Sequence, residues 1–192
     1  MIRSLILFAA LLIASPALAE VTEQVRTETD GTTTLEHELT VAAAPEAVWE
    51  AIATAEGWKS WAVPVAWIDP ADPDVIETSY NPAAKPGAPD TIRQRFLARI
   101  PGRMLAFRTI KAPVGFTHFD QFRQMLSVFE LEPLPGGATR VRLSGVGYPD
   151  SEAGRRLLAF FSAGNKVSLE MLRDRFETGP VDWAEKLKKP LK

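Results

Sequence analysis

Hydrophobic and polar residues alternate along most of the middle of the chain. Between Leu35 and Val41 every second residue is apolar except His37, and the residues between them are polar or charged, which predicts a strand with one buried face. The same alternation predicts further strands at residues 63–69, 75–80, 91–100, 104–110, 124–132 and 139–148. Proline and glycine at 100–103 and 133–137 are typical of tight turns, so we expect neighbouring strands to pair antiparallel.

Helical spacing of apolar residues occurs in three places. Two short helices are predicted after the first strand, one opening at Pro45 and one over residues 55–61. The third begins after Ser151, a good capping residue, and its apolar positions continue to Thr178, where a Gly-Pro pair ends it. The chain therefore carries one long amphipathic helix near its C-terminus.

The order of these elements predicts an α+β fold. A sheet with one apolar face must be covered, and only the last helix is long enough to cover it. We therefore expect a curved antiparallel sheet of about seven strands that wraps around the C-terminal helix. Side chains cannot fill all the space between a strongly bent sheet and a single helix, so a tapered apolar cavity is expected at the open end.

Three segments carry a resemblance to a known family: residues 41–52 (VAAAPEAVWEAI), 58–61 (WKSW) and 136–141 (GGATRV). They resemble the SRPBCC or START-like helix-grip superfamily, in particular its polyketide-cyclase and chaperone-ATPase-activator-homologue branch, from Leu35 to Glu177. The resemblance implies a helix-grip fold that binds a lipid, a polyketide or another hydrophobic small molecule between the sheet and the long helix. Only some members are enzymes, so the resemblance implies fold more firmly than activity.

The first 19 residues have the pattern of a secretory signal. Arg3 supplies a positive start, residues 5–14 are apolar, and Ala17-Leu18-Ala19 forms a cleavage site before Glu20. The apolar run is shorter than the roughly 20 residues that a spanning helix requires, which argues against an uncleaved anchor. We therefore expect a periplasmic or secreted protein with a bacterial-type export signal.

The rest of the chain divides into three parts. Residues 20–33 are expected to be a polar leader or a frayed first strand, and residues 34–180 the SRPBCC/START-like domain. Residues 181–192 are a basic tail, which we expect to be a disordered, solubilising end rather than a membrane contact.

Composition excludes several classes of function. The length of 192 residues suits one domain, and a formal net charge of -2 leaves no broad basic field for nucleic acid. Because the chain has no cysteine, it has no disulfide, thiolate nucleophile or cysteine-ligated metal centre. The two histidines lack the spacing of a metal site, and no phosphate loop or dinucleotide fingerprint is present. We therefore predict neither a metal nor a cofactor.

Nine residues are candidates for lining the groove. Trp61 and Trp67 fall near its predicted mouth, where an indole serves either a ligand or the core. Asn165 interrupts the apolar stripe of the long helix, so its amide needs a partner, which is either solvent or a polar group of a ligand. The other candidates depend on a strand register that the sequence leaves open, and they are Phe96, Met104, Phe107, Phe129, Phe161 and Leu169.

The catalytic candidates are His37 and His118. His37 lies on an otherwise apolar strand face, either as a hydrogen-bonded structural residue without an obvious partner or as a general base. His118 stands near Asp120 in a segment that we expect to be a mobile flap. Arginines 93, 95 and 99 share one face of a strand, where they either attract a carboxylate or lie on a solvated outer face.

The leading interpretation is an exported protein that binds a small hydrophobic or amphipathic molecule in the groove, and whose protein partners are unknown. It contains no integral membrane segment once the signal is removed. The alternatives are a cyclase- or hydrolase-type enzyme that uses the same groove, or a protein-interaction module like the chaperone activators. Export opposes the last alternative, because a chaperone of that kind consumes ATP, which is lacking outside the inner membrane.

Overall fold

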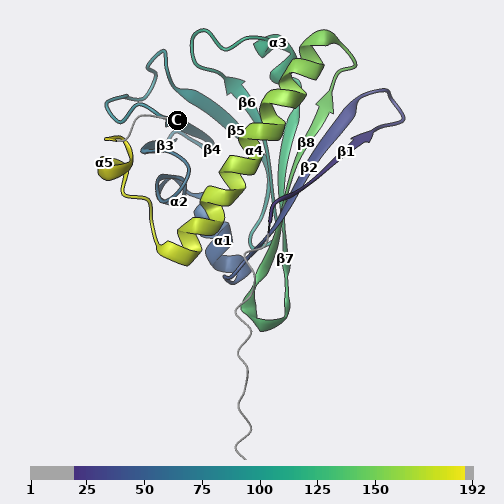
Figure 1. The fold of residues 1–192 in the computed structure, drawn as a ribbon. Coiled ribbons are helices and arrows are strands. Elements are labelled where there is room, and N and C mark those ends of the chain that lie inside the picture. The colour runs from purple at the N-terminus through teal and green to yellow at the C-terminus, as the bar shows by residue number, and fades with distance from the viewer. Residues whose placement is uncertain (1–19, 189–192) are drawn as a thin grey trace, which may run out of the picture.

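The computed structural model describes residues 20–188. Its single antiparallel sheet has eight strands in the order β1-β2-β8-β7-β6-β5-β4-β3 (Figure 1). The strands are β1 (Thr22–Thr27), β2 (Thr33–Val41), β3 (Val65–Asp69), β4 (Asp72–Ser79), β5 (Ile92–Ile100), β6 (Met104–Lys111), β7 (Leu126–Pro133) and β8 (Thr139–Tyr148). The predicted export signal, residues 1–19, and residues 189–192 of the predicted tail lie outside the described residues.

The sheet has one strand more than predicted. Thr22–Thr27, within the expected polar leader, forms the edge strand β1 and pairs with β2 so that Glu23 lies opposite His37. Every residue of β1 is exposed, so no alternation of buried apolar residues marks it in the sequence. An exposed edge strand is the kind of element that periodicity does not detect.

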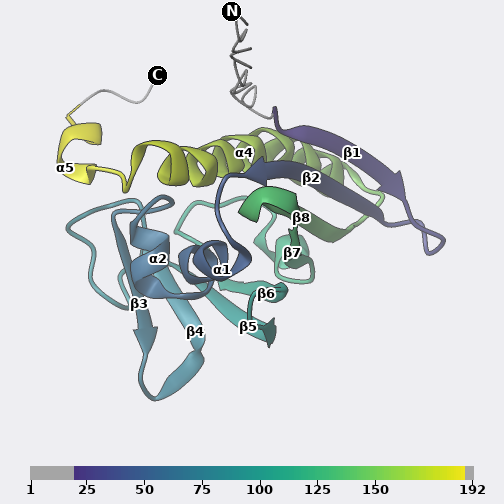
Figure 2. The same ribbon diagram turned by 90° about the horizontal axis from the view of Figure 1, so that it is seen from below.

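The long helix α4 (Glu152–Thr178) begins as predicted, with the Ser151 hydroxyl accepting a hydrogen bond from the Gly154 amide. Figure 2 shows the sheet curving from β1 round to β3, with α4 lying along its open side. The shorter helices are α1 (Pro45–Ala53), α2 (Ala55–Lys59), α3 (Phe119–Phe122), the single turn η1 (Pro135–Gly137) and α5 (Trp183–Lys186). The predicted α+β fold, a curved sheet around one long C-terminal helix, is confirmed.

Two tryptophans hold α2 against α1. The indole of Trp58 donates a hydrogen bond to the Ile52 carbonyl at 2.6 Å, and that of Trp61 donates to the Ala51 carbonyl at 2.9 Å. Gly57 permits this close approach, because a Cβ atom there would lie 1.9 Å from the Glu50 carbonyl oxygen. These contacts hold α1 and α2 together as one rigid unit at one end of the sheet.

The apolar residues form two separate clusters. The larger one lies where α1 and α2 meet the sheet, and it includes Leu169 and Leu172 of α4. The smaller one surrounds Leu157 near the N-terminal end of α4 and includes Leu35 and Tyr148. No residue of α4 between Leu157 and Leu169 is buried, although Leu158 and Phe161 pack against the smaller cluster, so the centre of the helix is only half-buried between the two cores.

Part of the predicted basic tail folds back onto the domain. The Val181 amide donates to the Ser60 carbonyl at 2.9 Å, and the Trp183 indole donates to the Lys59 carbonyl at 2.6 Å. These contacts place α5 beside α2, so residues 181–183 are not a free end. No helix within residues 20–188 is both long and apolar enough to span a membrane.

Candidate functional site

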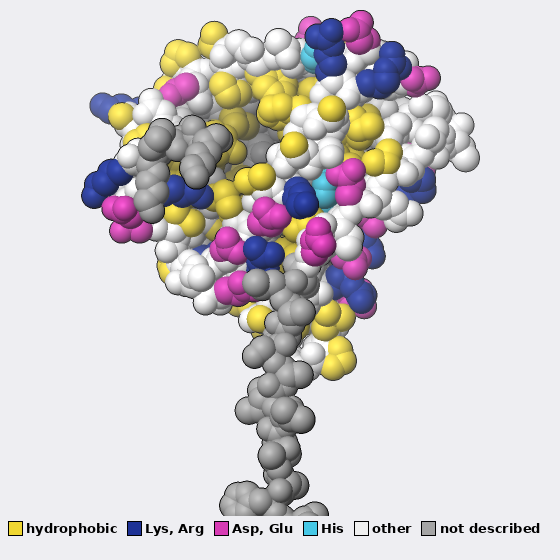
Figure 3. Space-filling model, viewed as in Figure 1, with side chains coloured by type: hydrophobic (Ala, Val, Ile, Leu, Met, Phe, Trp, Pro, Cys, Tyr) yellow, Lys and Arg dark blue, Asp and Glu magenta, His cyan; other side chains and the backbone are white. Residues whose placement is uncertain are grey.

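A groove separates the centre of α4 from the far half of the sheet. α4 packs mainly on β2 and β8, whereas β3 to β6 curve away from it (Figure 2). The buried stripe of the helix carries Phe161, Asn165 and Ser168 at its centre, and all three are only half-buried. Figure 3 shows hydrophobic side chains gathered around a hollow beside the helix. The groove is therefore the candidate site.

Aromatic residues close one end of the groove. The ring of Phe122, from α3, stacks on Phe161 of α4 with 4.6 Å between centroids, and Phe116 meets Phe160 edge-on at 5.9 Å. Tyr148 lies 6.4 Å from Phe161. Rings in these arrangements attract one another, which adds to the stabilisation that they gain from being buried. The segment between β6 and β7 is thereby fastened to the N-terminal half of α4.

Two loops meet at the rim. The Val114 amide donates to the Pro89 carbonyl at 3.0 Å, which joins the segment after β6 to the loop between β4 and β5. Tyr80 begins that loop with 65% of its surface exposed, yet desolvation raises the pKa of its phenol. Its exposure places Tyr80 at the surface of the rim and outside the packed core.

Five of the nine predicted lining residues belong to the packed core. Each of them is at most 5% exposed, and they are Trp61, Phe96, Phe107, Phe129 and Leu169. Phe107 and Phe129 stack on each other with centroids 6.1 Å apart. These five residues all belong to the larger core cluster, while Phe161 and Asn165 lie at the centre of α4, facing the sheet.

Trp67 and Met104 lie on the other face of the sheet. On β3, Trp67 pairs with Glu77, which is the residue next to the core residue Ile76 and so points to the opposite face. On β6, Met104 pairs with Glu130 and is the residue next to the fully buried Leu105, so it also points to the opposite face. Because successive strand residues point to opposite faces, a shift of one position removes a side chain from the groove. Neither residue lines the groove.

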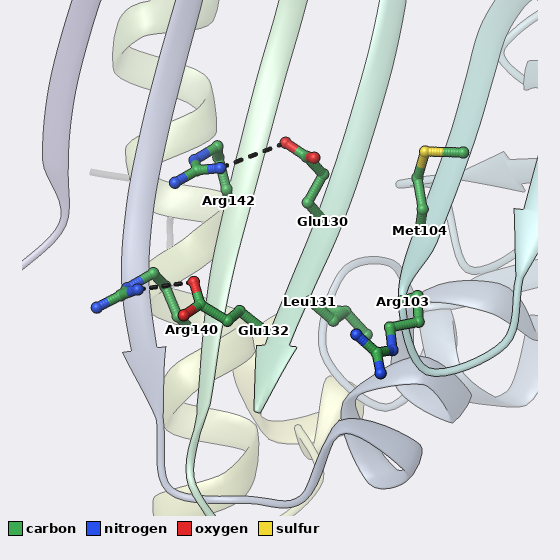
Figure 4. Close-up of a pocket in the computed structure, with 7 residues that line it drawn as sticks. All are labelled: Arg103, Met104, Glu130, Leu131, Glu132, Arg140 and Arg142. Carbon is green, nitrogen blue, oxygen red and sulfur yellow. Dashed lines mark hydrogen bonds and ion pairs between the residues drawn. The ribbon is translucent and has the colours of Figure 1, made fainter. Parts of the chain in front are cut away.

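Two pockets, of about 320 and 360 Å³, lie outside the groove, over β6 to β8 and over β1 and β2. In the first, Arg140 bonds Glu132 at 2.7 Å and Arg142 lies 3.6 Å from Glu130 (Figure 4). Burial alone would lower the pKa of Arg142, but the nearby glutamates outweigh it and raise that pKa. Charges paired in this way are typical of a solvated outer face.

His37 has a partner that the sequence did not indicate. The residue is 1% exposed, and its Nε2 atom lies 3.0 Å from Oε2 of Glu23 on β1. The Ser162 hydroxyl of α4 donates to the same carboxylate oxygen at 2.6 Å. The other ring nitrogen, Nδ1, is buried without a hydrogen-bond partner. The cluster ties β1, β2 and α4 together.

His118 lies apart from this cluster in the fold, immediately before α3. Its backbone is left-handed, with φ 61°, and its carbonyl accepts hydrogen bonds from the amides of Gln121 and Phe122. Within residues 20–188 its imidazole takes part in no hydrogen bond or ion pair. The described part of the chain also holds no group of three acidic or histidine side chains placed to bind a metal.

The sequence reasoning missed an uncharged polar patch on the inner wall of the groove. Gln94 and Thr109 face each other across β5 and β6, and Thr78 lies on the same face of β4. A signal for two of them was present, because Gln94 alternates with Phe96 and Thr109 with Phe107. Nothing comparable marks Glu23, since its role depends on a contact with another strand.

The fold and the groove together define a helix-grip protein. Residues 32–177 match the family described as polyketide cyclase / dehydrase and lipid transport, so the chain belongs to that family, within the SRPBCC superfamily. This confirms the predicted resemblance. No curated protein matches the chain.

Solved structures share the fold at low sequence identity. MLL2253 from Mesorhizobium loti is 21% identical, with a TM-score of 0.57 over 77% of this chain and 99% of that one. The Aha1 dimer from Colwellia psychrerythraea is 18% identical, with a TM-score of 0.57 over 76% and 97%. CalU16 from Micromonospora echinospora is 16% identical, with a TM-score of 0.55 over 90% and 91%. At such identities the likeness concerns the fold alone.

Proposed function

We propose that the chain binds a small hydrophobic or amphipathic molecule, lipid- or polyketide-like, in the groove between α4 and the inner face of β4 to β6. The observation that carries this proposal is the centre of α4, where none of the residues between Leu157 and Leu169 is buried. A half-buried helix stripe that faces the inner surface of a curved sheet leaves room for another apolar body where the sheet curves away from the helix. The family match is consistent with that role.

Native mass spectrometry of the gently purified protein tests the proposal, with a neutral fluorescent probe, N-phenyl-1-naphthylamine, as a second assay. We expect a co-purified lipid-like molecule or saturable enhancement of the probe's fluorescence. Ser168→Trp should fill the groove and abolish binding, whereas Ala163→Trp, at an exposed position of the same helix, should not. An empty protein that also fails to bind the probe would refute the proposal, as would unchanged binding by a folded Ser168→Trp variant.

One observation favours a second candidate, a cyclase- or hydrolase-type enzyme. The contact between Glu23 and Nε2 orients the ring of His37, leaving Nδ1 as the nitrogen that accepts a proton. Turnover would require the buried ring to become accessible. If a screen of ester substrates detected activity that survived replacement of both His37 and His118 by alanine, this version of the enzyme would be excluded.

We also propose that the protein is exported and acts in the periplasm or outside the cell. The N-terminal pattern of a charge, an apolar run and an Ala-x-Ala site supports this. Mass analysis of the protein recovered from its native compartment should give a chain that begins at Glu20. Recovery of the full-length chain from the cytoplasm would contradict the proposal.

A further inference from the structure

The inner wall of the groove carries three uncharged polar side chains on adjacent strands. Gln94 on β5 pairs with Ile76 of β4 on one side and with Thr109 of β6 on the other. Paired residues of antiparallel strands share a face, and Ile76 belongs to the core, so Gln94 and Thr109 point inward. Thr78 follows Ile76 by two residues and therefore points the same way. We call Thr78, Gln94 and Thr109 the polar wall.

The polar wall is not satisfied by the protein itself. The Gln94 side-chain oxygen is buried and has no hydrogen-bond partner. Within the part of the chain that the structure describes, the hydroxyls of Thr78 and Thr109 also make no hydrogen bond, although these residues are only 2% and 4% exposed. Of these three groups only the Gln94 oxygen is a buried atom without a partner, and buried polar groups are nearly always paired. The Gln94 oxygen therefore indicates a place for an external partner, beside two threonine hydroxyls that are free to bond it.

The polar wall is also uncharged. The charged neighbours of Gln94 along β5 lie on the opposite face, where Arg95 pairs with Asp72 at 2.8 Å and Arg93 lies 3.8 Å from Glu77. A carboxylate brought to the inner face would lose its hydration without gaining a cation. Arg93 and Arg95 of the predicted row therefore lie on the outer face and cannot select an acid within the groove. The register shift after Phe96 places Arg99 opposite the core residue Leu105, so the three arginines do not share one face as predicted, and Arg99 pairs with Asp74 instead.

We propose that the polar wall is a hydrogen-bonding subsite for a neutral hydroxyl group, and that the ligand is a hydroxylated hydrophobic molecule rather than a fatty acid. This inference rests on the proposed function of the groove. A hydroxyl can donate to the Gln94 oxygen and accept from a threonine hydroxyl, whereas a carbonyl group has no proton to donate. A ligand hydroxyl group can thus act as both donor and acceptor toward the polar wall, and no charged group has to be buried.

Three naphthalene probes of similar shape separate the possibilities: 1-naphthol, 1-methylnaphthalene and 1-naphthoate. Their affinities are to be measured by isothermal titration calorimetry on the mature protein. We expect 1-naphthol to bind about tenfold more tightly than 1-methylnaphthalene, the ratio that one good hydrogen bond supplies. The naphthoate should bind most weakly of the three.

Substitutions then locate the effect. Gln94→Leu should remove the preference for 1-naphthol while keeping the affinity for 1-methylnaphthalene, and the near-isosteric Thr109→Val should reduce the preference. Gln24→Leu, at an exposed position of β1, is the matched control and should leave all three affinities unchanged.

The two proposals fail differently. If neither 1-naphthol nor 1-methylnaphthalene binds, the binding function itself is refuted. If both bind with equal affinity, or if the preference survives in both Gln94→Leu and Thr109→Val, the groove binds apolar molecules but the polar wall is not a hydroxyl subsite. Should Gln94→Leu fail to fold, Thr109→Val alone decides, because it removes a hydroxyl with almost no change of shape.

Discussion

The imidazole of His37 and the carboxylate of Glu23 meet across the first two strands, with Nε2 and Oε2 3.0 Å apart. The two residues are direct partners in the β1–β2 ladder, and Ser162 of α4 donates to the same carboxylate oxygen. β1 is an edge strand whose residues are all exposed, so few apolar contacts hold it. This polar cluster is therefore a principal attachment of β1 to the helix.

Glu23→Ala should loosen that attachment. The substitution leaves the buried Nε2 of His37 without its partner, at a cost of about 1 kcal/mol, because the 41%-exposed Glu23 site lets water replace part of the interaction. Urea unfolding measures the loss. Gln24→Ala, which removes an exposed side chain from the next position of β1, is the control, and equal stability of the two variants would contradict the assigned role.

The glycines of α2 and α4 should respond to alanine in opposite directions. Gly57→Ala places a Cβ atom 1.9 Å from the Glu50 carbonyl oxygen, which forces α1 and α2 apart. We expect a loss of about 3 kcal/mol or failure to fold. Gly164→Ala meets nothing within 4 Å and should stabilise α4 by up to about 1 kcal/mol. Thermal unfolding compares them, and a harmless Gly57→Ala would contradict the close helix contact.

Stability should fall at alkaline pH through Tyr148. Burial raises the pKa of this phenol well above its ordinary value of 10.0, so the folded protein keeps a proton that the unfolded chain releases. The stabilisation is complete below pH 10.0 and is lost progressively as the pH rises above it. Urea unfolding between about pH 9 and 12 should show this decline in wild type.

Tyr148→Phe provides the check, because phenylalanine does not ionise. Its stability should depend less on pH than that of wild type over the same range. Tyr80 is the only other tyrosine, so a Tyr80→Phe background isolates the absorbance of Tyr148 during titration. A Tyr148 that titrates near pH 10.0 in the folded protein would show that the ring is not buried.

Trp183→Phe should release the C-terminal segment without unfolding the domain. The substitution removes the indole N–H that donates to the Lys59 carbonyl at 2.6 Å, which costs about 1 kcal/mol of local stability. Hydrogen exchange should become faster over residues 181–187 while global unfolding is unchanged. Lys188→Ala, at an exposed position, is the control, and unchanged exchange in Trp183→Phe would refute the contact.

The sequence alone determined the elements whose residues alternate between core and solvent. β2, β8 and α4 were predictable because their apolar spacing is a local property of the chain, and capping by Ser151 is local too. The family resemblance predicted the same fold and no particular activity, because the segments that carry it have structural roles. With few elements long enough to cover the sheet, the fold class followed.

Tertiary structure alone decided which side chains meet. The prediction that Trp67 and Met104 line the groove was wrong, because a difference of one residue in register places a side chain on the opposite face of the strand. β1 carried no signal because it buries nothing, and the partner of His37 comes from that strand. Gln94 and Thr109 become one polar wall only when β5 and β6 pair. Contacts between strands depend on register and curvature, which are set by the whole folded chain and by no single segment.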